Sequence, residues 1–161
     1  MASFSSHALA LPFFLVVLLI VASSSSPTVL DAAGNQMNQG LVHIHVYMHE
    51  TSAGPNATFA RILGSPLGAN SSFGVMGVVD NELRAGPDRA SSELMGRFQG
   101  LIVGAGLQPG MGYFTSVTLL FSAGEYSGCT LSIQGPVPSF TVTFERPVVG
   151  GTGAFRFVRG Y

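Results

Sequence analysis

Hydrophobic and polar positions alternate along most of the chain after residue 40. The even positions from 42 to 48 are apolar, for example, and serine and threonine fill most of one side of residues 112–122. A period of two places successive side chains on opposite faces of a β-strand, and this part of the sequence lacks the period of a helix. The pattern predicts seven strands, at residues 41–50, 73–80, 94–103, 112–122, 129–134, 140–145 and 155–158.

Turn signals separate these strands. Glycine and proline adjoin at residues 54–55, 86–87, 109–110 and 135–136, and three glycines fall within residues 150–153. Such pairs interrupt regular structure, and 21 glycines suit a tightly curved sheet. Many short strands without a helix predict an all-β fold, a barrel or a sandwich.

The first part of the chain has a different character. Residues 8–22 (ALALPFFLVVLLIVA) are apolar, but the run is shorter than the roughly 20 residues that span a bilayer, and Pro12 would interrupt a membrane helix. The segment predicts a secretory signal peptide within residues 1–33, cleaved between 22 and 33, and one domain at residues 34–161. An uncleaved anchor is the alternative, because no Lys or Arg precedes the run.

The charge composition excludes two classes of binding partner. The seven basic residues are all arginine and face eight acidic residues, so no basic patch is expected for nucleic acid and no polybasic segment for a membrane surface. Cys129 is the single cysteine, which excludes a disulfide within the chain. Because it alternates with Leu131 and Ile133, we expect it to act as a small buried apolar residue.

Two glycosylation acceptors lie in loop-like sequence. They are Asn56 in Asn-Ala-Thr and Asn70 in Asn-Ser-Ser. Together with the signal segment they predict a glycoprotein secreted to the extracellular space.

Three charged residues extend faces that otherwise are apolar. Glu50 follows Val42–Met48, Asp80 follows Met76 and Val78, and Arg159 follows Phe155 and Phe157. Because burying an unpaired charge is costly, an inward-facing ion must be paired, hydrated or functional. We expect these side chains to line an apolar cavity, where a carboxyl group could donate a proton or orient a phenol. Alternatively, the strands end near these residues and the charges meet solvent.

A metal site is a second interpretation of the same region. His43, His45 and Glu50 have the spacing His-x-His-x4-Glu, which resembles the first half of the cupin and germin metal motif. No histidine follows residue 49 to complete the ligand set, so we expect no metal ligand here. No dinucleotide loop or hydrolase elbow is present either, and we expect no cofactor.

Several motifs resemble the plant dirigent family in order and spacing. The similarity covers nearly the whole chain after the signal segment, and the last motif is specific. The motifs are VYMHE (46–50), GPNAT (54–58), VVD (78–80), GRFQG (96–100), GEYSGCTL (124–131), PVVGGTG (147–153) and FRFVRGY (155–161).

The resemblance implies a fold and a function. It implies an antiparallel up-and-down β-barrel of eight strands, secreted to the apoplast as a homo-oligomer, either a dimer or a trimer. Family members receive phenoxy radicals or quinone methides made by a separate oxidase, a laccase or peroxidase. They control the stereochemistry of coupling, for example of coniferyl alcohol to lignans, and some cyclise related quinone methides. We therefore expect no oxidase activity from this chain itself.

Four residues match the family's functional positions. These are Glu50 and Asp80 as acids, Tyr126 as the tyrosine of a turn, and Arg159 as the arginine. The alternative is that Tyr126 closes the barrel mouth by packing alone. Ala154 stands where lignan-forming members place an acid, and Glu50 replaces the usual Asp. The chain stops at Tyr161, so we expect the last strand to be missing. A defence-related binding or wall protein without chemistry is the remaining alternative.

Overall fold

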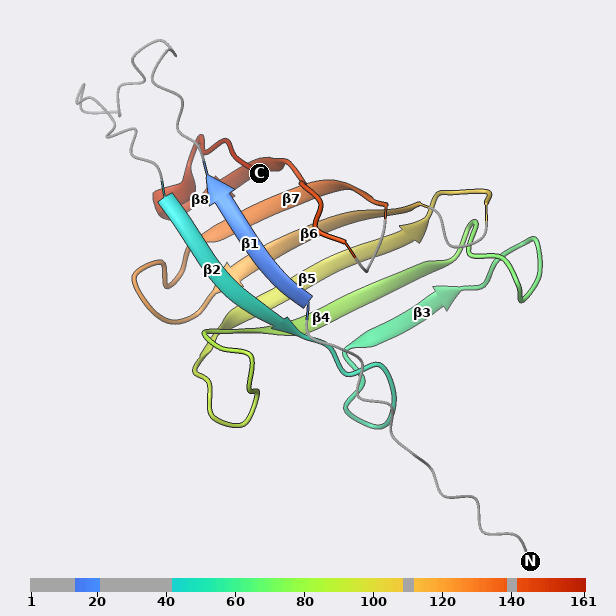
Figure 1. The fold of residues 1–161 in the computed structure, drawn as a ribbon, viewed down its shortest axis with the longest axis horizontal. Coiled ribbons are helices and arrows are strands. Elements are labelled where there is room, and N and C mark those ends of the chain that lie inside the picture. The colour runs from blue at the N-terminus through green and yellow to red at the C-terminus, as the bar shows by residue number, and fades with distance from the viewer. Residues whose placement is uncertain (1–13, 21–41, 109–111, 139–141) are drawn as a thin grey trace, which may run out of the picture.

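The computed structural model describes residues 14–20, 42–108, 112–138 and 142–161, with residues 14–20 as backbone. These residues form eight strands and a short 3-10 helix (Figure 1). In chain order they are β1 (Phe14–Ile20), β2 (Val42–His49), β3 (Phe59–Leu63), β4 (Met76–Arg84), β5 (Leu94–Gly104), β6 (Tyr113–Phe121), β7 (Thr130–Val137), β8 (Val148–Thr152) and η1 (Gly153–Phe155).

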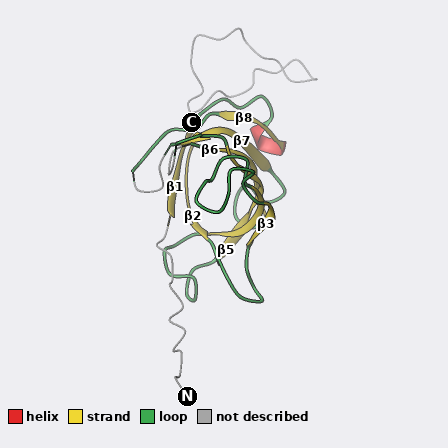
Figure 2. Cartoon of the chain, turned by 90° about the vertical axis from the view of Figure 1, so that its right-hand side faces the viewer, coloured by secondary structure: helices red, strands yellow, loops and turns green. Residues whose placement is uncertain are grey.

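The strands form one antiparallel sheet in the order β1-β2-β4-β5-β6-β7-β8. The short strand β3 pairs with β4 along the part that β2 leaves free. Viewed from the side, the sheet curls strongly around an interior (Figure 2). Within the described residues no ladder joins β8 to β1 or β2, so the sheet is a half-barrel. The predicted all-β, antiparallel barrel class is confirmed in this form.

One face of the sheet carries the hydrophobic core, and we call it the inner face. Its side chains alternate along each strand, as Val79 and Leu83 do on β4 and Val117 and Leu119 on β6. Leu83, Leu119 and Leu131 are completely buried. Burial of each such side chain stabilises the fold by about 1.5–3 kcal/mol relative to exposure. We call the opposite face, with Asp80 and Glu82 on β4, the outer face.

Glycines on β5 allow the sheet to bend this tightly. A Cβ atom on Gly96 would lie 2.0 Å from the carbonyl oxygen of Leu120, and one on Gly100 would lie 2.2 Å from that of Ser116. No side chain fits at these distances, so the close approach of β6 at these two positions requires glycine on β5. The expectation that glycine accompanies strong curvature of the sheet is therefore met at Gly96 and Gly100.

The last part of the chain differs from the predicted strands. The segment that starts at residue 140 is not a strand over its described residues, 142–145, and the strand predicted at 155–158 is wrong too. Instead β8 takes the predicted turn at 150–153, because Val148 is buried and Gly151 lets the Phe155 side chain pack against it. Phe155 then turns inward in η1, while Phe157 has a φ of 62° and lies exposed.

The N-terminal segment pairs with β2. The register of β1 runs from Phe14 opposite Met48 to Ile20 opposite Val42. This strand lies within the segment predicted as a signal peptide, and the predicted cleavage region, residues 22–33, lies outside the described residues. In the described ranges, no helix has the length and hydropathy to span a membrane.

Candidate functional site

A carboxylate and a buried amide meet at one end of the inner face. Glu50 follows the last residue of β2 and is exposed, whereas Asn81 on β4 is 1% exposed. Asn81 Nδ2 donates a hydrogen bond to Glu50 Oε2 at 3.4 Å. The other polar atom of the amide, Oδ1, is buried and has no hydrogen-bond partner in the structure. A buried oxygen without a partner is unfavourable, so the amide is a strained polar group within the apolar inner face.

The neighbouring His49 anchors this end. It is the last residue of β2, it is 6% exposed, and its Nε2 donates to the carbonyl oxygen of Gly86 at 3.1 Å. This bond ties the end of β2 to the loop that follows β4, and so fixes the backbone from which Glu50 projects.

Tyr126 lies at the same end, in the turn between β6 and β7. Its ring packs against Phe155, with centroids 4.7 Å apart, and against Phe121, with centroids 6.2 Å apart. Phe121 is in register with Gly96, and Gly96 with Leu83 of β4, which places Tyr126 near the Glu50 end of the sheet. Partial burial, and secondarily the Glu125 carboxylate, raise the pKa of the Tyr126 hydroxyl. The phenol therefore stays protonated at neutral pH and can donate a hydrogen bond.

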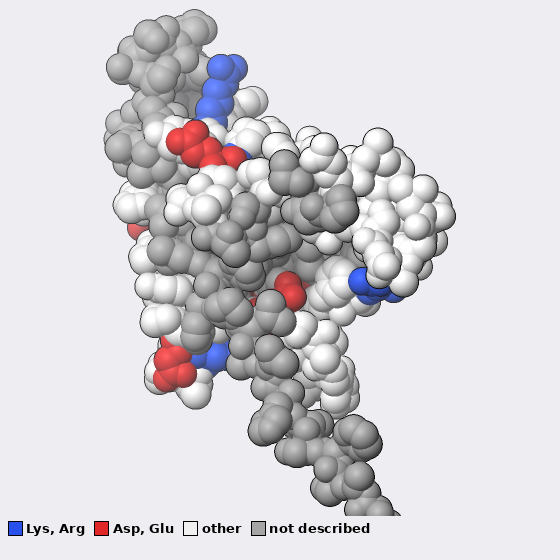
Figure 3. Space-filling model, turned by 45° about the vertical axis from the view of Figure 1, so that its right-hand side comes forward, with Lys and Arg blue, Asp and Glu red and all other residues white. Residues whose placement is uncertain are grey.

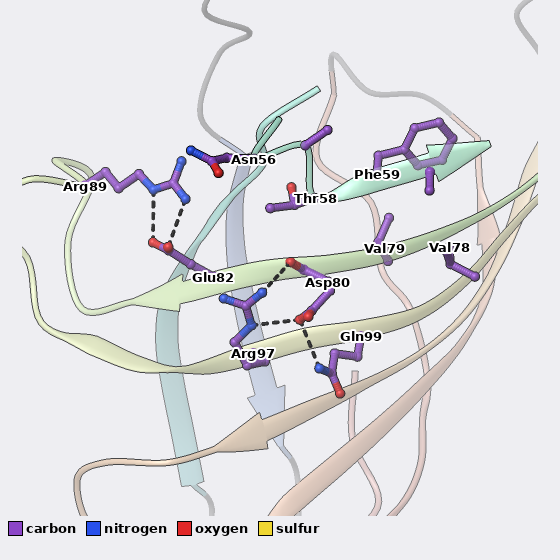
Figure 4. Close-up of a pocket in the computed structure, with 12 residues that line it drawn as sticks. Asn56, Thr58, Phe59, Val78, Val79, Asp80, Glu82, Arg89, Arg97 and Gln99 are labelled. Carbon is purple, nitrogen blue, oxygen red and sulfur yellow. Dashed lines mark hydrogen bonds and ion pairs between the residues drawn. The ribbon is translucent and has the colours of Figure 1, made fainter. Parts of the chain in front are cut away.

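Asp80 is on the outer face, so its predicted inward placement is wrong. Its Oδ1 accepts hydrogen bonds from Arg97 Nε at 2.7 Å and from Gln99 Nε2 at 2.9 Å (Figure 4). The side chain is 52% exposed. The hydrogen bond from Arg97 is the main reason why the pKa of Asp80 lies below its usual value. The carboxylate is paired and hydrated, as in the alternative interpretation.

Glu82 forms two further ion pairs on the same face. Its carboxylate accepts from Arg89 at 2.8 Å and from Arg84 at 2.7 Å. These bonds, that from Arg89 above all, lower the pKa of Glu82 to about 2.

The Asp80–Arg97 and Glu82–Arg89 ion pairs border an open hollow of about 720 Å³. The loop before β3 and the beginning of β3 form one side of it, and β4 and β5 form the other (Figure 4). On the described part of the face in Figure 3, charged side chains are few and scattered, and most of the surface is uncharged. The hollow is therefore open to solvent, and the carboxylates at its border already have arginine partners.

Arg159 does not lie on the inner face. It follows η1 in the short segment that returns along β8, where Gly160 bridges to Val148, and its side chain is exposed. The predicted inward placement of Arg159 is wrong because residues 155–158, whose alternation predicts a strand, form the end of η1 and a turn instead.

Comparison with known proteins decides the family. The family model described as "Dirigent-like protein" matches residues 41–161. The chain belongs to the dirigent family. It is 36% identical over 159 residues to Dirigent protein 21 of Arabidopsis thaliana, with 95% of this chain and 83% of that protein covered. It is 40% identical over 161 residues to Pterocarpan synthase 1 of Glycyrrhiza echinata, with 96% and 81% covered.

Solved dirigent structures have the same fold. The structure of the pterocarpan synthase dirigent protein GePTS1 superposes with a TM-score of 0.67 at 36% identity, over 73% of this chain and 68% of that one. That of the pterocarpan synthase dirigent protein PsPTS1 gives a TM-score of 0.65 at 39% identity, over 73% and 77%.

In this dirigent, the structure thus brings Glu50 and Tyr126 to one end of the half-barrel and leaves Asp80 and Arg159 elsewhere. Asn81 was missed because the predicted strand ended at residue 80. The signal was present: charged residues at 80, 82 and 84 alternate with Asn81 and Leu83, which marks the inner face.

The other candidate sites lie at the surface. His43 and His45 are exposed on the outer face of β2, and the described residues contain no group of three or more His, Cys, Asp or Glu side chains that could hold a metal ion. Asn56 and Asn70 are exposed in loops, as a glycan would require. Glycosylation stays a prediction.

Proposed function

We propose that this dirigent holds a phenolic radical or quinone methide on its inner face and controls the face at which the new bond forms. A separate oxidase, a laccase or peroxidase, generates the reactive species. The observation that carries the proposal is the Glu50–Asn81 pair, in which a buried amide holds an exposed carboxylate at the end of an otherwise apolar interior. Family membership supports a stereochemical role.

The physical basis is orientation. Coupling of two radicals needs no further catalyst, so a protein contributes by restricting which faces meet. Partly buried apolar residues at the edge of the core, such as Met48 and Tyr126, offer contact to aromatic rings. The exposed Glu50 carboxylate, held by Asn81, can accept a hydrogen bond from a phenolic hydroxyl or the proton of a hydroxyl that closes a ring.

Coniferyl alcohol is the substrate with which to test this proposal. A laccase oxidises it with and without the protein, and chiral chromatography gives the enantiomeric excess of the coupled lignans. We expect an excess with the protein, and we expect Glu50→Gln to reduce it because the amide cannot accept a proton. Racemic lignans in both arms would refute control of lignan coupling by this chain.

Ring closure is a second candidate function, because two of the similar solved structures are pterocarpan synthase dirigent proteins. In that case the substrate is a quinone methide whose own hydroxyl attacks the methide carbon. The test supplies such a precursor without any oxidase and measures the rate and enantiomeric excess of the cyclic product. An effect here, with racemic coniferyl alcohol products, would favour ring closure over radical coupling.

We also propose that the chain is secreted, glycosylated and oligomeric. The exposure of Asn56 and Asn70 supports the glycans. Expression in a secreting eukaryotic host followed by glycosidase treatment tests this, and a mass that does not change on treatment would refute it. Light scattering on the secreted protein gives the oligomer.

A further inference from the structure

A guanidinium group lies partly buried at the other end of the half-barrel. Arg146 immediately precedes Pro147, whose ring packs over Gly135 of β7, with Cδ 3.3 Å from where a Cβ of Gly135 would be. Gly135 is in register with Thr115 of β6, and both are buried positions of the inner face. From there Arg146 Nη2 donates a hydrogen bond to Thr115 Oγ1.

Arg146 differs from every other arginine of the chain. Arg84, Arg89 and Arg97 form ion pairs with Glu82 or Asp80. Within the described residues the other four form none, and three of these, Arg61, Arg156 and Arg159, are exposed to solvent. Among the described residues, Arg146 alone is both partly buried and without a carboxylate partner. Its Nε is completely buried and has no hydrogen-bond partner among these residues.

Such an arrangement is unfavourable for the protein by itself. A guanidinium has five N–H donors, and a cation that is removed from water needs an anion or several acceptors. Burial lowers the pKa of Arg146 to about 10, so the group still carries its charge at neutral pH. The fold therefore maintains a partly desolvated cation on its inner face.

We propose that Arg146 and Thr115 form an anchor for an oxyanion, the phenolate or carboxylate oxygen of an aromatic ligand. A guanidinium binds such oxygens through charge-assisted hydrogen bonds and binds carboxylates in a bidentate manner. Ile102 of β5, which is in register with Thr115 and only partly buried, offers apolar contact to the ring. The aromatic nature of the ligand rests on the proposed function, whereas the preference for an anion rests on Arg146.

The anchor is well separated from the Glu50–Asn81 pair. Asn81 is in register with Phe98, and Phe98 with Leu119 of β6, four residues from Thr115. At the rise of a strand this is about 13 Å along the sheet. A ligand held at the Arg146 end by its oxyanion would extend over the apolar lining toward the pair. One fixed end restricts which ring face is presented, which is what stereocontrol requires.

Binding of three simple probes tests the anchor. Calorimetry compares 4-methoxycinnamate, which has a carboxylate and no phenol, with the neutral 4-methoxycinnamyl alcohol, and 4-nitrophenol serves as the phenolate probe at pH 8. For the wild-type protein we expect at least about tenfold tighter binding of an anion than of the neutral alcohol. The probe that shows the preference tells whether the site takes a carboxylate, a phenolate or both.

Variants assign the preference to one side chain. Arg146→Gln should bring the ratio of affinities to about one, Arg146→Lys should retain part of it, and Arg156→Gln, the exposed control, should leave it unchanged. Circular dichroism checks the fold of each variant, and the lysine variant decides if the glutamine variant does not fold. Equal affinities of wild type for all three probes, or a preference that survives both substitutions, would overturn the proposal.

The outcome is separable from that of the proposed function. The binding assay involves no oxidase and no coupling, so an anion preference that depends on Arg146 establishes the anchor even if the lignans are racemic. Conversely, an enantiomeric excess that Arg146→Gln leaves intact, without any anion preference, supports stereocontrol and refutes the anchor.

Discussion

The two faces of the half-barrel treat their polar groups in opposite ways. On the outer face Asp80 and Glu82 are each bonded to arginine and lie partly in solvent. On the inner face Asn81 is buried and Arg146 is partly buried, and each has one atom without a hydrogen-bond partner among the described residues. The outer groups are the more conspicuous in sequence, because they are charged, but their interactions are complete. Incomplete interactions, rather than charge, indicate where a ligand binds.

Adjacent residues of β4 illustrate the difference most directly. Asp80 and Asn81 are consecutive, yet the first has a side chain 52% exposed and the second residue is 1% exposed. Because successive residues of a strand point to opposite faces, a shift of one position exchanges a surface ion pair for an interior acceptor. The following experiments test this contrast, from the largest expected effect to the smallest.

The largest effect is expected from the apolar part of the inner face. Leu119→Ala removes a completely buried side chain and should lower the free energy of unfolding by about 2–5 kcal/mol. Leu101 on β5 is 43% exposed. Leu101→Ala should therefore change the free energy of unfolding by no more than about 0.5 kcal/mol. Urea unfolding followed by circular dichroism measures both. Similar losses for the two variants would contradict the assignment of the faces.

Glu82 should give a smaller and pH-dependent effect. Its pKa is lowered to about 2 from an ordinary 4.5, so the carboxylate stabilises the fold above about pH 4.5 and this contribution is lost as the pH falls toward 2. Arg89 is 42% exposed and solvent screens the pair, so we expect Glu82→Gln to cost about 1–2 kcal/mol at pH 7. The difference from wild type should nearly vanish at pH 2. A constant difference across this range, or an equal loss in the exposed control Glu93→Gln, would be inconsistent with the pair.

Asn81→Leu should act in the opposite direction on stability. Leucine has a similar size and removes a buried oxygen without a partner, so the free energy of unfolding should rise by about 1 kcal/mol. Thermal unfolding provides the measurement. A loss of stability of the same size would mean that the amide is a structural group with satisfied interactions.

The smallest effect is expected from Asp80→Asn. The pair with Arg97 is exposed, and pairs of this kind contribute about 0–1 kcal/mol. Added salt screens such a pair, so any difference between variant and wild type should shrink at 1 M NaCl. A salt-independent loss above about 2 kcal/mol would show that Asp80 is not the surface group described here.

Much of the fold could be predicted from the sequence. The strands around residues 42–49, 113–121 and 130–137 have clear alternation, because one face of each lies in the core and the other does not. The end of the chain was not predictable in this way. The alternation of Phe155 and Phe157 predicts a strand face. In the structure Phe155 packs on Tyr126 and Phe157 has a positive φ, so these residues lie in a turn.

The candidate site could be predicted only in part. Glu50 and Tyr126 follow from motifs, but Asn81 and Arg146 depend on tertiary contacts. Arg146 belongs to a segment without regular structure, and only the return of the chain over Gly135 brings it to Thr115. No local pattern encodes that approach. Residues 75–79 are apolar at both odd and even positions, so their sequence alone does not show which face of β4 is the inner one.

The enantiomeric excess of Asn81→Leu and of Asp80→Asn, measured side by side in laccase-driven coupling of coniferyl alcohol, tests the central claim most directly. If the inner face directs the reaction, the first variant gives racemic products while remaining folded, and the second keeps the wild-type excess. Retention of the excess by Asn81→Leu together with its loss in Asp80→Asn would contradict the account and transfer stereocontrol to the outer face.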